Sequence, residues 1–184
     1  MKKYVLKYGF IAGGMMSAMM LATVPFMHKF GMEVGLVIGY SSMILAFLMI
    51  YFGVRAYRDA VLNGVIGFGA AFKAGLLITL LSSACYVATW EVVYFGGFAP
   101  NIMEDYVAQA IAKSRTSGKP QAAIDAEIKE MEQMQINYRK PLYNMAYTFI
   151  EPLPVGLLLT LLSAGLLSRK RRPATAAGGL ASQT

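Results

Sequence analysis

The chain has 184 residues, of which 57% are hydrophobic and 15% charged, and its formal net charge is +7. Ordinary water-soluble domains carry about 25% charged residues. The lower charged fraction of this chain, together with its mean hydropathy of +0.50, excludes such a domain. The cations stand beside apolar runs, where they orient membrane helices, so the net charge does not indicate a nucleic-acid partner. We therefore predict a single membrane domain over residues 1–172, with the lipid bilayer as its main surroundings.

Four apolar runs are long enough to cross a hydrocarbon core of ~30 Å, which needs about 20 helical residues. They cover residues 8–27, 35–53, 71–95 and 147–167. The sequence thus predicts an all-α membrane protein, a bundle of four transmembrane helices.

The first two runs are flanked unevenly by charge. Three lysines precede the first run, whereas the short connection after it holds only Lys29 as a cation. The second run is followed by Arg55, Arg58 and Asp59, which we interpret as an interfacial charge cluster. Because Lys and Arg concentrate on the cytoplasmic side, this pattern predicts a cytoplasmic N-terminus and a cytoplasmic charge cluster.

The segment between the third and fourth runs, residues 96–146, holds six cations and six acids. Its near-neutral charge and its length are compatible with translocation, so we expect it outside the cytoplasm. Two helical arms are predicted at 101–114 and 121–139, separated by a turn that contains Gly118 and Pro120. An apolar stripe at helical spacing, with Ile124 and Ile128, favours packing of the two arms as an extracytoplasmic helical hairpin.

The fourth run is followed by four consecutive basic residues, 169–172. These place the C-terminus in the cytoplasm, and the small, polar residues 173–184 are typical of a flexible cytoplasmic tail.

Small residues recur at helix-packing spacing within the runs. They are Gly9, Gly13 and Ser17, then Gly35 and Gly39, then Gly156, Thr160 and Ala164. Such faces let helix backbones approach closely, either inside one bundle or between copies in a homo-oligomer.

Glu91 and Glu151 are acidic residues within apolar runs, where an uncompensated carboxylate is costly. The predicted orientation brings both to the outer boundary, together with His28 and Glu33 of the first connection. These four residues form a candidate ion or proton site. The alternative is that the carboxylates sit at the wet interface and pair with Lys29, Arg139 or Lys140.

Signatures of catalysis and of cofactor binding do not occur in the sequence. His28 is the only histidine, and neither zinc-ligand spacing nor a dinucleotide fingerprint is present. We expect no catalytic residues, no metal site and no cofactor.

Two strings, YSSMILAFLMIYFGVRAYRD and GVIGFGAAFKAGLLITLLSSACYVATW, resemble a bacterial inner-membrane family known as domain of unknown function 4199. The resemblance is carried by Tyr40, Met43, Phe52, Gly53, Arg55, Tyr57, Arg58, Asp59, Gly64, Phe68, Phe72, Gly75, Tyr86 and Trp90. It implies four spans and a bacterial inner membrane, and it implies no catalytic residues.

The leading functional hypothesis is a noncatalytic assembly, scaffold or regulatory component of the envelope that binds a protein partner through the outer hairpin. The alternative is a small oligomeric carrier or channel, coupled to protons or cations through the outer carboxylates.

Overall fold

The computed structural model describes residues 1–99 and 101–168, apart from the side chains of Met27, His28, Phe30 and Met32. This part of the chain is helical and contains no strand. Its elements are α1 Lys2–Thr23, the 3-10 turn η1 Val24–Phe26, α2 Met27–Val61, α3 Phe68–Phe95, α4 Ile102–Arg115, α5 Gln121–Tyr138, α6 Pro141–Ile150 and α7 Leu153–Leu167.

Four helical segments are long and apolar enough to cross a membrane, which confirms the all-α class and the predicted number of spans. They are Lys2–Phe26, Glu33–Val61, Phe68–Phe95 and Pro141–Leu167, and the fourth contains both α6 and α7. The basic segment 169–172 and the tail 173–184 lie outside the described residues.

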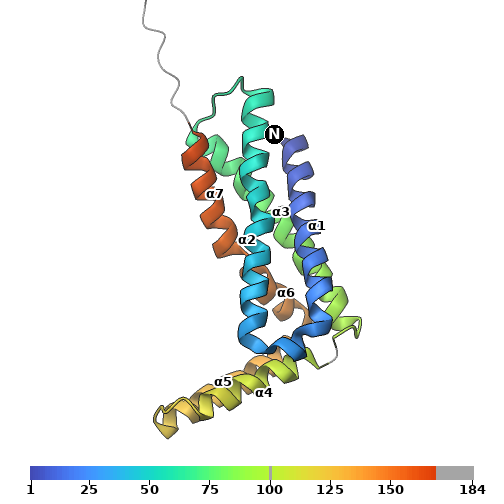
Figure 1. The fold of residues 1–184 in the computed structure, drawn as a ribbon, viewed down its shortest axis with the longest axis vertical. Helices are drawn as coiled ribbons and strands as arrows, with labels where there is room; N and C mark the ends of the chain where they lie inside the picture. Colours follow the sequence, from blue (N-terminus) through green and yellow to red (C-terminus); the bar gives the residue numbers. More distant parts are fainter. Residues whose placement is uncertain (100, 169–184) are drawn as a thin grey trace, which may run out of the picture.

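The spans run lengthwise, and α3 crosses behind the others at a tilt while it contacts α1, α2, α6 and α7 (Figure 1). The N-terminus, the end of α2, the start of α3 and the end of α7 lie at one end of the bundle. Helices α4 and α5 pack against each other at the opposite end and project to one side. We call this pair the arm; the side of the membrane on which it lies stays a prediction.

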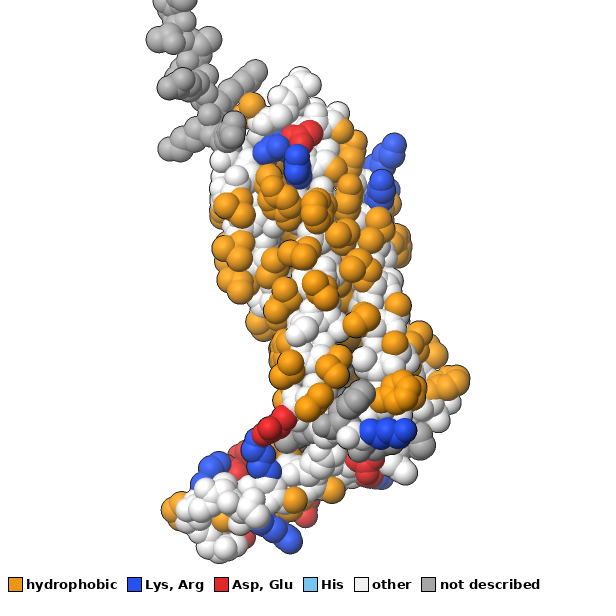
Figure 2. Space-filling view, in the orientation of Figure 1, with side chains coloured by type: hydrophobic (Ala, Val, Ile, Leu, Met, Phe, Trp, Pro, Cys, Tyr) orange, Lys and Arg blue, Asp and Glu red, His pale blue; other side chains and the backbone are white. Residues whose placement is uncertain are grey.

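The bundle is held by an apolar core in which Phe47, Ile50, Val54 and Ile78 are almost completely buried. A buried hydrogen bond of 3.0 Å joins the hydroxyl groups of Thr79 on α3 and Thr160 on α7. On the face of the bundle seen in Figure 2, apolar side chains are spread along the spans, as expected for a surface that contacts lipid.

Two of the three predicted small-residue faces pack against α3 within the molecule. An added Cβ at Gly13 would lie 2.6 Å from the Cβ of Cys85, and one at Gly156 would lie 2.3 Å from Thr79 Cγ2. Gly35 and Gly39 of the remaining face instead line a cavity. A homo-oligomer formed through these faces stays a prediction.

The helices differ from the predicted apolar runs in continuity and in length. Helix α2 continues past Gly53 to Val61, because hydrogen bonding along the backbone does not stop where apolar residues end. Near its start it is kinked at Gly31, whose φ of 74° and ψ of 169° suit glycine and few other residues. The fourth span is interrupted between Ile150 and Leu153.

Candidate functional site

A cavity of about 350 Å³ opens between the spans and the arm at the end of the bundle away from the N-terminus. Its wall is built from the second half of α1, the first half of α2 and the end of α3, together with both arm helices and the fourth span. Aromatic and methionine side chains dominate it, and one carboxylate, that of Glu151, is among them. The lining residues are Met16, Met19, Met20, Thr23, Val24, Gly35, Leu36, Ile38, Gly39, Tyr40, Ser42, Met43, Tyr86, Trp90, Ile102, Met103, Tyr106, Met134, Tyr138, Tyr147 and Glu151.

Glu151 lies at the break between α6 and α7. Pro152 and Pro154 follow it, and because proline has no N–H, each removes one hydrogen bond of the helical ladder and bends the span here. Glu151 stands sixteen residues before Leu167. Because a helix rises 1.5 Å per residue, the two residues are at most about 24 Å apart along the span. A hydrocarbon core of ~30 Å measured from Leu167 therefore includes this carboxylate.

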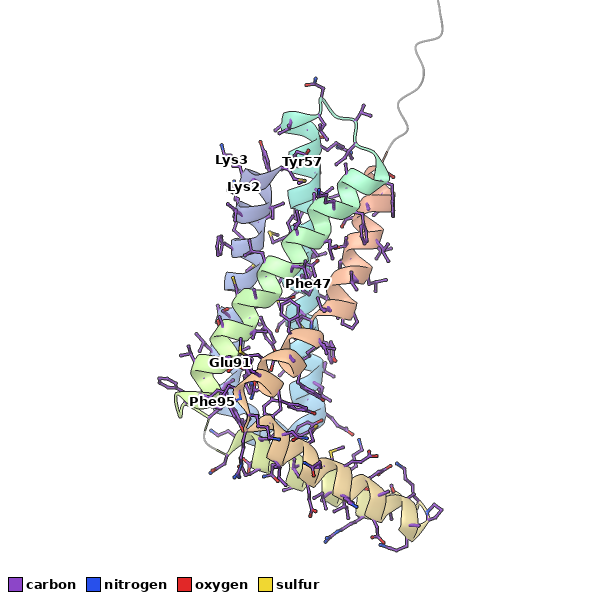
Figure 3. The ribbon with its side chains drawn as sticks, turned by 180° about the vertical axis from the view of Figure 1, so that it is seen from behind. Lys2, Lys3, Phe47, Tyr57, Glu91 and Phe95 are labelled. Carbon is purple, nitrogen blue, oxygen red and sulfur yellow. The ribbon has the colours of Figure 1, made fainter. Side chains whose placement is uncertain are left out.

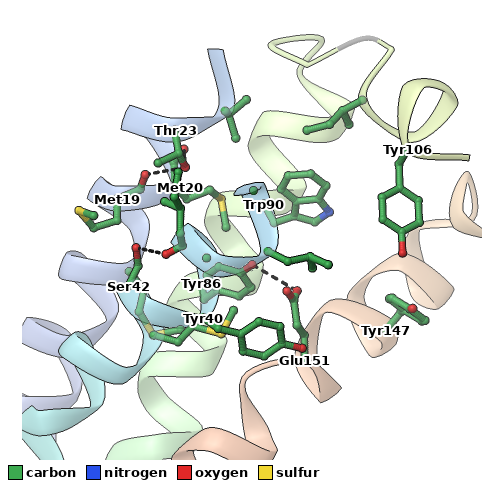
Figure 4. A pocket seen from close by; sticks show the side chains of 18 of the residues that line it. Met19, Met20, Thr23, Tyr40, Ser42, Tyr86, Trp90, Tyr106, Tyr147 and Glu151 are labelled. Atoms are coloured by element: carbon green, nitrogen blue, oxygen red, sulfur yellow. Dashed lines mark hydrogen bonds between the residues drawn. The ribbon is translucent and has the colours of Figure 1, made fainter. Parts of the chain in front are cut away.

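The Glu151 carboxylate is held by a neighbouring tyrosine. The Tyr86 hydroxyl donates a hydrogen bond of 3.3 Å to Glu151 Oε2, and the side chains of Tyr40 and Tyr86 point into the same space (Figure 4). None of the ion pairs between described residues includes Glu151. Among the described residues, its hydrogen-bond partner is therefore the Tyr86 hydroxyl, and no cation pairs with it.

The arm closes the cavity at one side. Met103 is buried, and Tyr138 at the end of α5 packs in the same cluster. Burial raises the pKa of Tyr138 to about 12, and a hydrogen bond to Thr148 has a smaller, opposing effect. The side-chain amide of Asn144 donates to the backbone oxygen of Tyr138 at 3.2 Å, which ties α6 to the arm.

Glu91 does not line the cavity, although it is only one residue from Trp90, which does. It lies in the last turns of α3, near Phe95 (Figure 3). One carboxylate oxygen, Oε1, is buried without a hydrogen-bond partner among the described residues. The structure therefore does not bring Glu91 and Glu151 into one site.

Glu33 also lies away from the contacts of the Glu151 carboxylate. Glu33 is exposed and forms an ion pair of 2.6 Å with Lys113 of the arm. The His28 side chain lies outside the described part of the chain.

The cations that the alternative prediction pairs with Glu91 and Glu151 contact other groups instead. Arg139 pairs with Glu104 at 3.0 Å, Lys140 donates to Asn137 at 2.9 Å, and Lys29 stands over the ring of Phe26 at 5.8 Å.

The cluster of Arg55, Arg58 and Asp59 lies on the last turns of α2, at the end of the bundle away from the arm and the cavity (Figure 1). Asp59 accepts from Arg58 at 2.7 Å and lies 3.7 Å from Arg55. Both contacts are solvent-exposed, and such pairs contribute little to stability.

The aromatic wall is the part of the site that sequence reasoning missed, because aromatic residues near the end of an apolar run are typical of headgroup anchors and do not by themselves indicate a cavity. Tyr86 and Trp90 are four positions apart in the sequence and so share one face of α3, which also points toward Glu151. This spacing is the signal by which the sequence could have indicated the aromatic wall.

Comparison with known proteins gives one result. The family described as "Protein of unknown function (DUF4199)" matches residues 7–169. Neither the curated proteins nor the solved structures provide a match. The match includes the arm, most of the first span and all of the other three, so the chain belongs to the DUF4199 family.

Proposed function

We propose that the protein is a small noncatalytic membrane carrier that moves protons through Glu151 and whose substrate site is the cavity beside this residue. The observation that carries this proposal is a carboxylate at hydrocarbon depth that faces a cavity and forms no ion pair with a described residue. Acidic side chains inside membrane segments are costly and commonly mark the path of a proton, an ion or a substrate. The helix break beside Glu151 adds support, since carriers often bind substrates where a membrane helix is interrupted.

We infer that the membrane is the inner membrane of a bacterium and that both chain ends are cytoplasmic. The support is that four cations share one end of the bundle: Figure 3 shows Lys2 and Lys3 at the same end as Tyr57, which stands between Arg55 and Arg58 on α2. The positive-inside bias assigns this end to the cytoplasm. The cavity then lies toward the outer side.

Proton movement through reconstituted protein tests the carrier. Vesicles that contain the protein, potassium and a pH-sensitive dye are diluted into low-potassium buffer, and valinomycin then makes the interior negative. We expect internal acidification to be faster than in protein-free vesicles and to fall to their rate with Glu151→Gln. Glu33→Gln is the matched control, because it changes an exposed carboxylate outside the cavity, and it should retain the flux. Equal flux with and without the Glu151 carboxylate would refute the proposal.

A second role, docking of an envelope protein, is supported by the projection of the arm and by the charged residues along it (Figure 2). A photoreactive residue in place of Ala122, which is exposed on α5, tests it in cells. A discrete protein adduct would support docking, whereas the absence of any protein adduct would exclude it at this surface.

A further inference from the structure

We propose that the substrate is an apolar organic cation, such as a quaternary ammonium group attached to a hydrophobic body. The proposal rests on the proposed function, because it names the class of molecule that the Glu151 cavity would take. It follows from the charge, the aromatic rings and the hydrogen-bonding capacity of the cavity wall.

The charge of the wall selects against anions. Glu151 is the only charged residue among those that line the cavity in the described part of the chain, and neither Lys, Arg nor His accompanies it. An anion placed there would meet an uncompensated carboxylate in surroundings of low dielectric constant, where repulsion is strong. A cation would instead neutralise it.

The aromatic residues provide further attraction for a cation. Six of the lining residues are aromatic: Tyr40, Tyr86, Trp90, Tyr106, Tyr138 and Tyr147. They come from α2, α3, both arm helices and α6, so rings surround the space from several sides. The face of such a ring attracts a cation, and groups of rings recognise quaternary ammonium ligands.

The remaining wall fits an apolar body better than a polar one. Six lining residues are methionines, whose flexible side chains adapt to irregular shapes. The two aliphatic hydroxyl groups donate to their own helices: Ser42 to the oxygen of Ile38 at 2.7 Å, and Thr23 to that of Met19 at 2.9 Å. Apart from the tyrosine hydroxyl groups, the Trp90 N–H and the Glu151 carboxylate, the wall therefore offers a ligand few hydrogen-bond partners.

A metal ion is a poorer fit than an organic cation. Divalent cations take six or more oxygen ligands, or four in the case of zinc. Within the described residues, no three His, Cys, Asp or Glu side chains are grouped closely enough to hold a metal ion. The cavity volume of about 350 Å³ falls at the lower end of the range of roughly 300–1,000 Å³ for small-molecule pockets.

Trp90 offers a direct reading of occupancy, because it is the only tryptophan of the chain and it lines the cavity. The full chain in lipid nanodiscs is titrated with benzyltrimethylammonium, with its neutral carbon isostere neopentylbenzene and with the anion phenylacetate. Signals from protein-free nanodiscs are subtracted to correct for partitioning into lipid. We expect a saturable change of Trp90 emission with the cation at a concentration at least tenfold lower than with either other compound.

Glu151→Gln should weaken binding of the cation at least tenfold and leave that of the neutral isostere unchanged, whereas Glu33→Gln should alter neither. Equal affinity for the cation and the isostere in the wild-type chain would overturn the proposal, and this comparison holds even if a variant does not fold. Binding without preference for the cation would leave the cavity as a substrate site and refute only its cation selectivity. No binding of any compound would refute the cation proposal, while the proton-flux measurement tests the carrier separately.

Discussion

Replacing Gly156 on α7 with alanine tests how closely the fourth span packs on α3. The new Cβ would lie 2.3 Å from Thr79 Cγ2 and 3.1 Å from Phe47 Cζ, whereas carbon atoms pack best at about 3.5–4.0 Å. The helices must therefore move apart or Thr79 must leave its position. Overpacking of this kind costs about 1–3 kcal/mol.

Gly165→Ala on the same helix is the matched control, since no atom lies within 4 Å of its added Cβ. Alanine gains about 1 kcal/mol of helix propensity over glycine at either position. The difference between the two variants therefore isolates the overpacking, and we expect Gly156→Ala to be the less stable by about 1–3 kcal/mol. Reversible unfolding in mixed micelles of increasing dodecyl sulfate content, followed by circular dichroism, measures this difference.

Thr79→Ser removes the clashing methyl group and keeps the hydroxyl that bonds Thr160 at 3.0 Å and the oxygen of Gly75 at 3.1 Å. In combination with Gly156→Ala it should restore most of the lost stability. The two changes then couple by at least about 1 kcal/mol in a double-mutant cycle. Additive effects, or equal stability of Gly156→Ala and Gly165→Ala, would show that α7 and α3 do not approach as described.

Two further predictions concern the arm. The hydrogen bond from Lys119 lowers the pKa of Glu127, so the ionised carboxylate stabilises the arm above the ordinary glutamate pKa, and this stabilisation is lost as the pH falls through the lowered pKa. Lys119→Met should therefore raise the pKa of Glu127, which carbon NMR of its carboxyl group measures. An unchanged pKa would contradict the contact. Single cysteines are placed at the exposed positions Ala60 and Ala122 in a Cys85→Ser background, which removes the native cysteine. A membrane-impermeant maleimide, added outside intact cells with a permeable outer membrane, should label Ala122→Cys and not Ala60→Cys. The reverse pattern would invert the proposed orientation.

The spans could be predicted from the sequence, because hydrocarbon thickness fixes the length of an apolar run. Glu151 could also be singled out, since a carboxylate within such a run is rare. Its cavity could not be predicted in the same way. The cavity depends on the bend at Pro152 and on arm residues such as Tyr138, which are close to Glu151 only after the chain folds back.

The expected grouping of Glu91 with Glu151 illustrates a second gap. The order of the spans fixes the approximate height of each residue in the membrane, but it does not fix the rotation of a helix about its axis. One residue along α3 turns the side chain by about 100°, which is enough for Trp90 to line the cavity while Glu91 does not. Only the packing of α3 against its neighbours sets this angle.

The arm has two parts that must be changed separately to learn what it does. Ile102, Met103, Tyr106, Met134 and Tyr138 line the cavity, so removing the whole arm would open the substrate site as well as remove a surface for partners. The distal turn, residues 116–120, does not line the cavity. Shortening or recharging this turn should therefore impair a docking role and leave cation binding intact, whereas Tyr138→Ala should do the opposite. The two proposed roles of the protein can be separated on this basis.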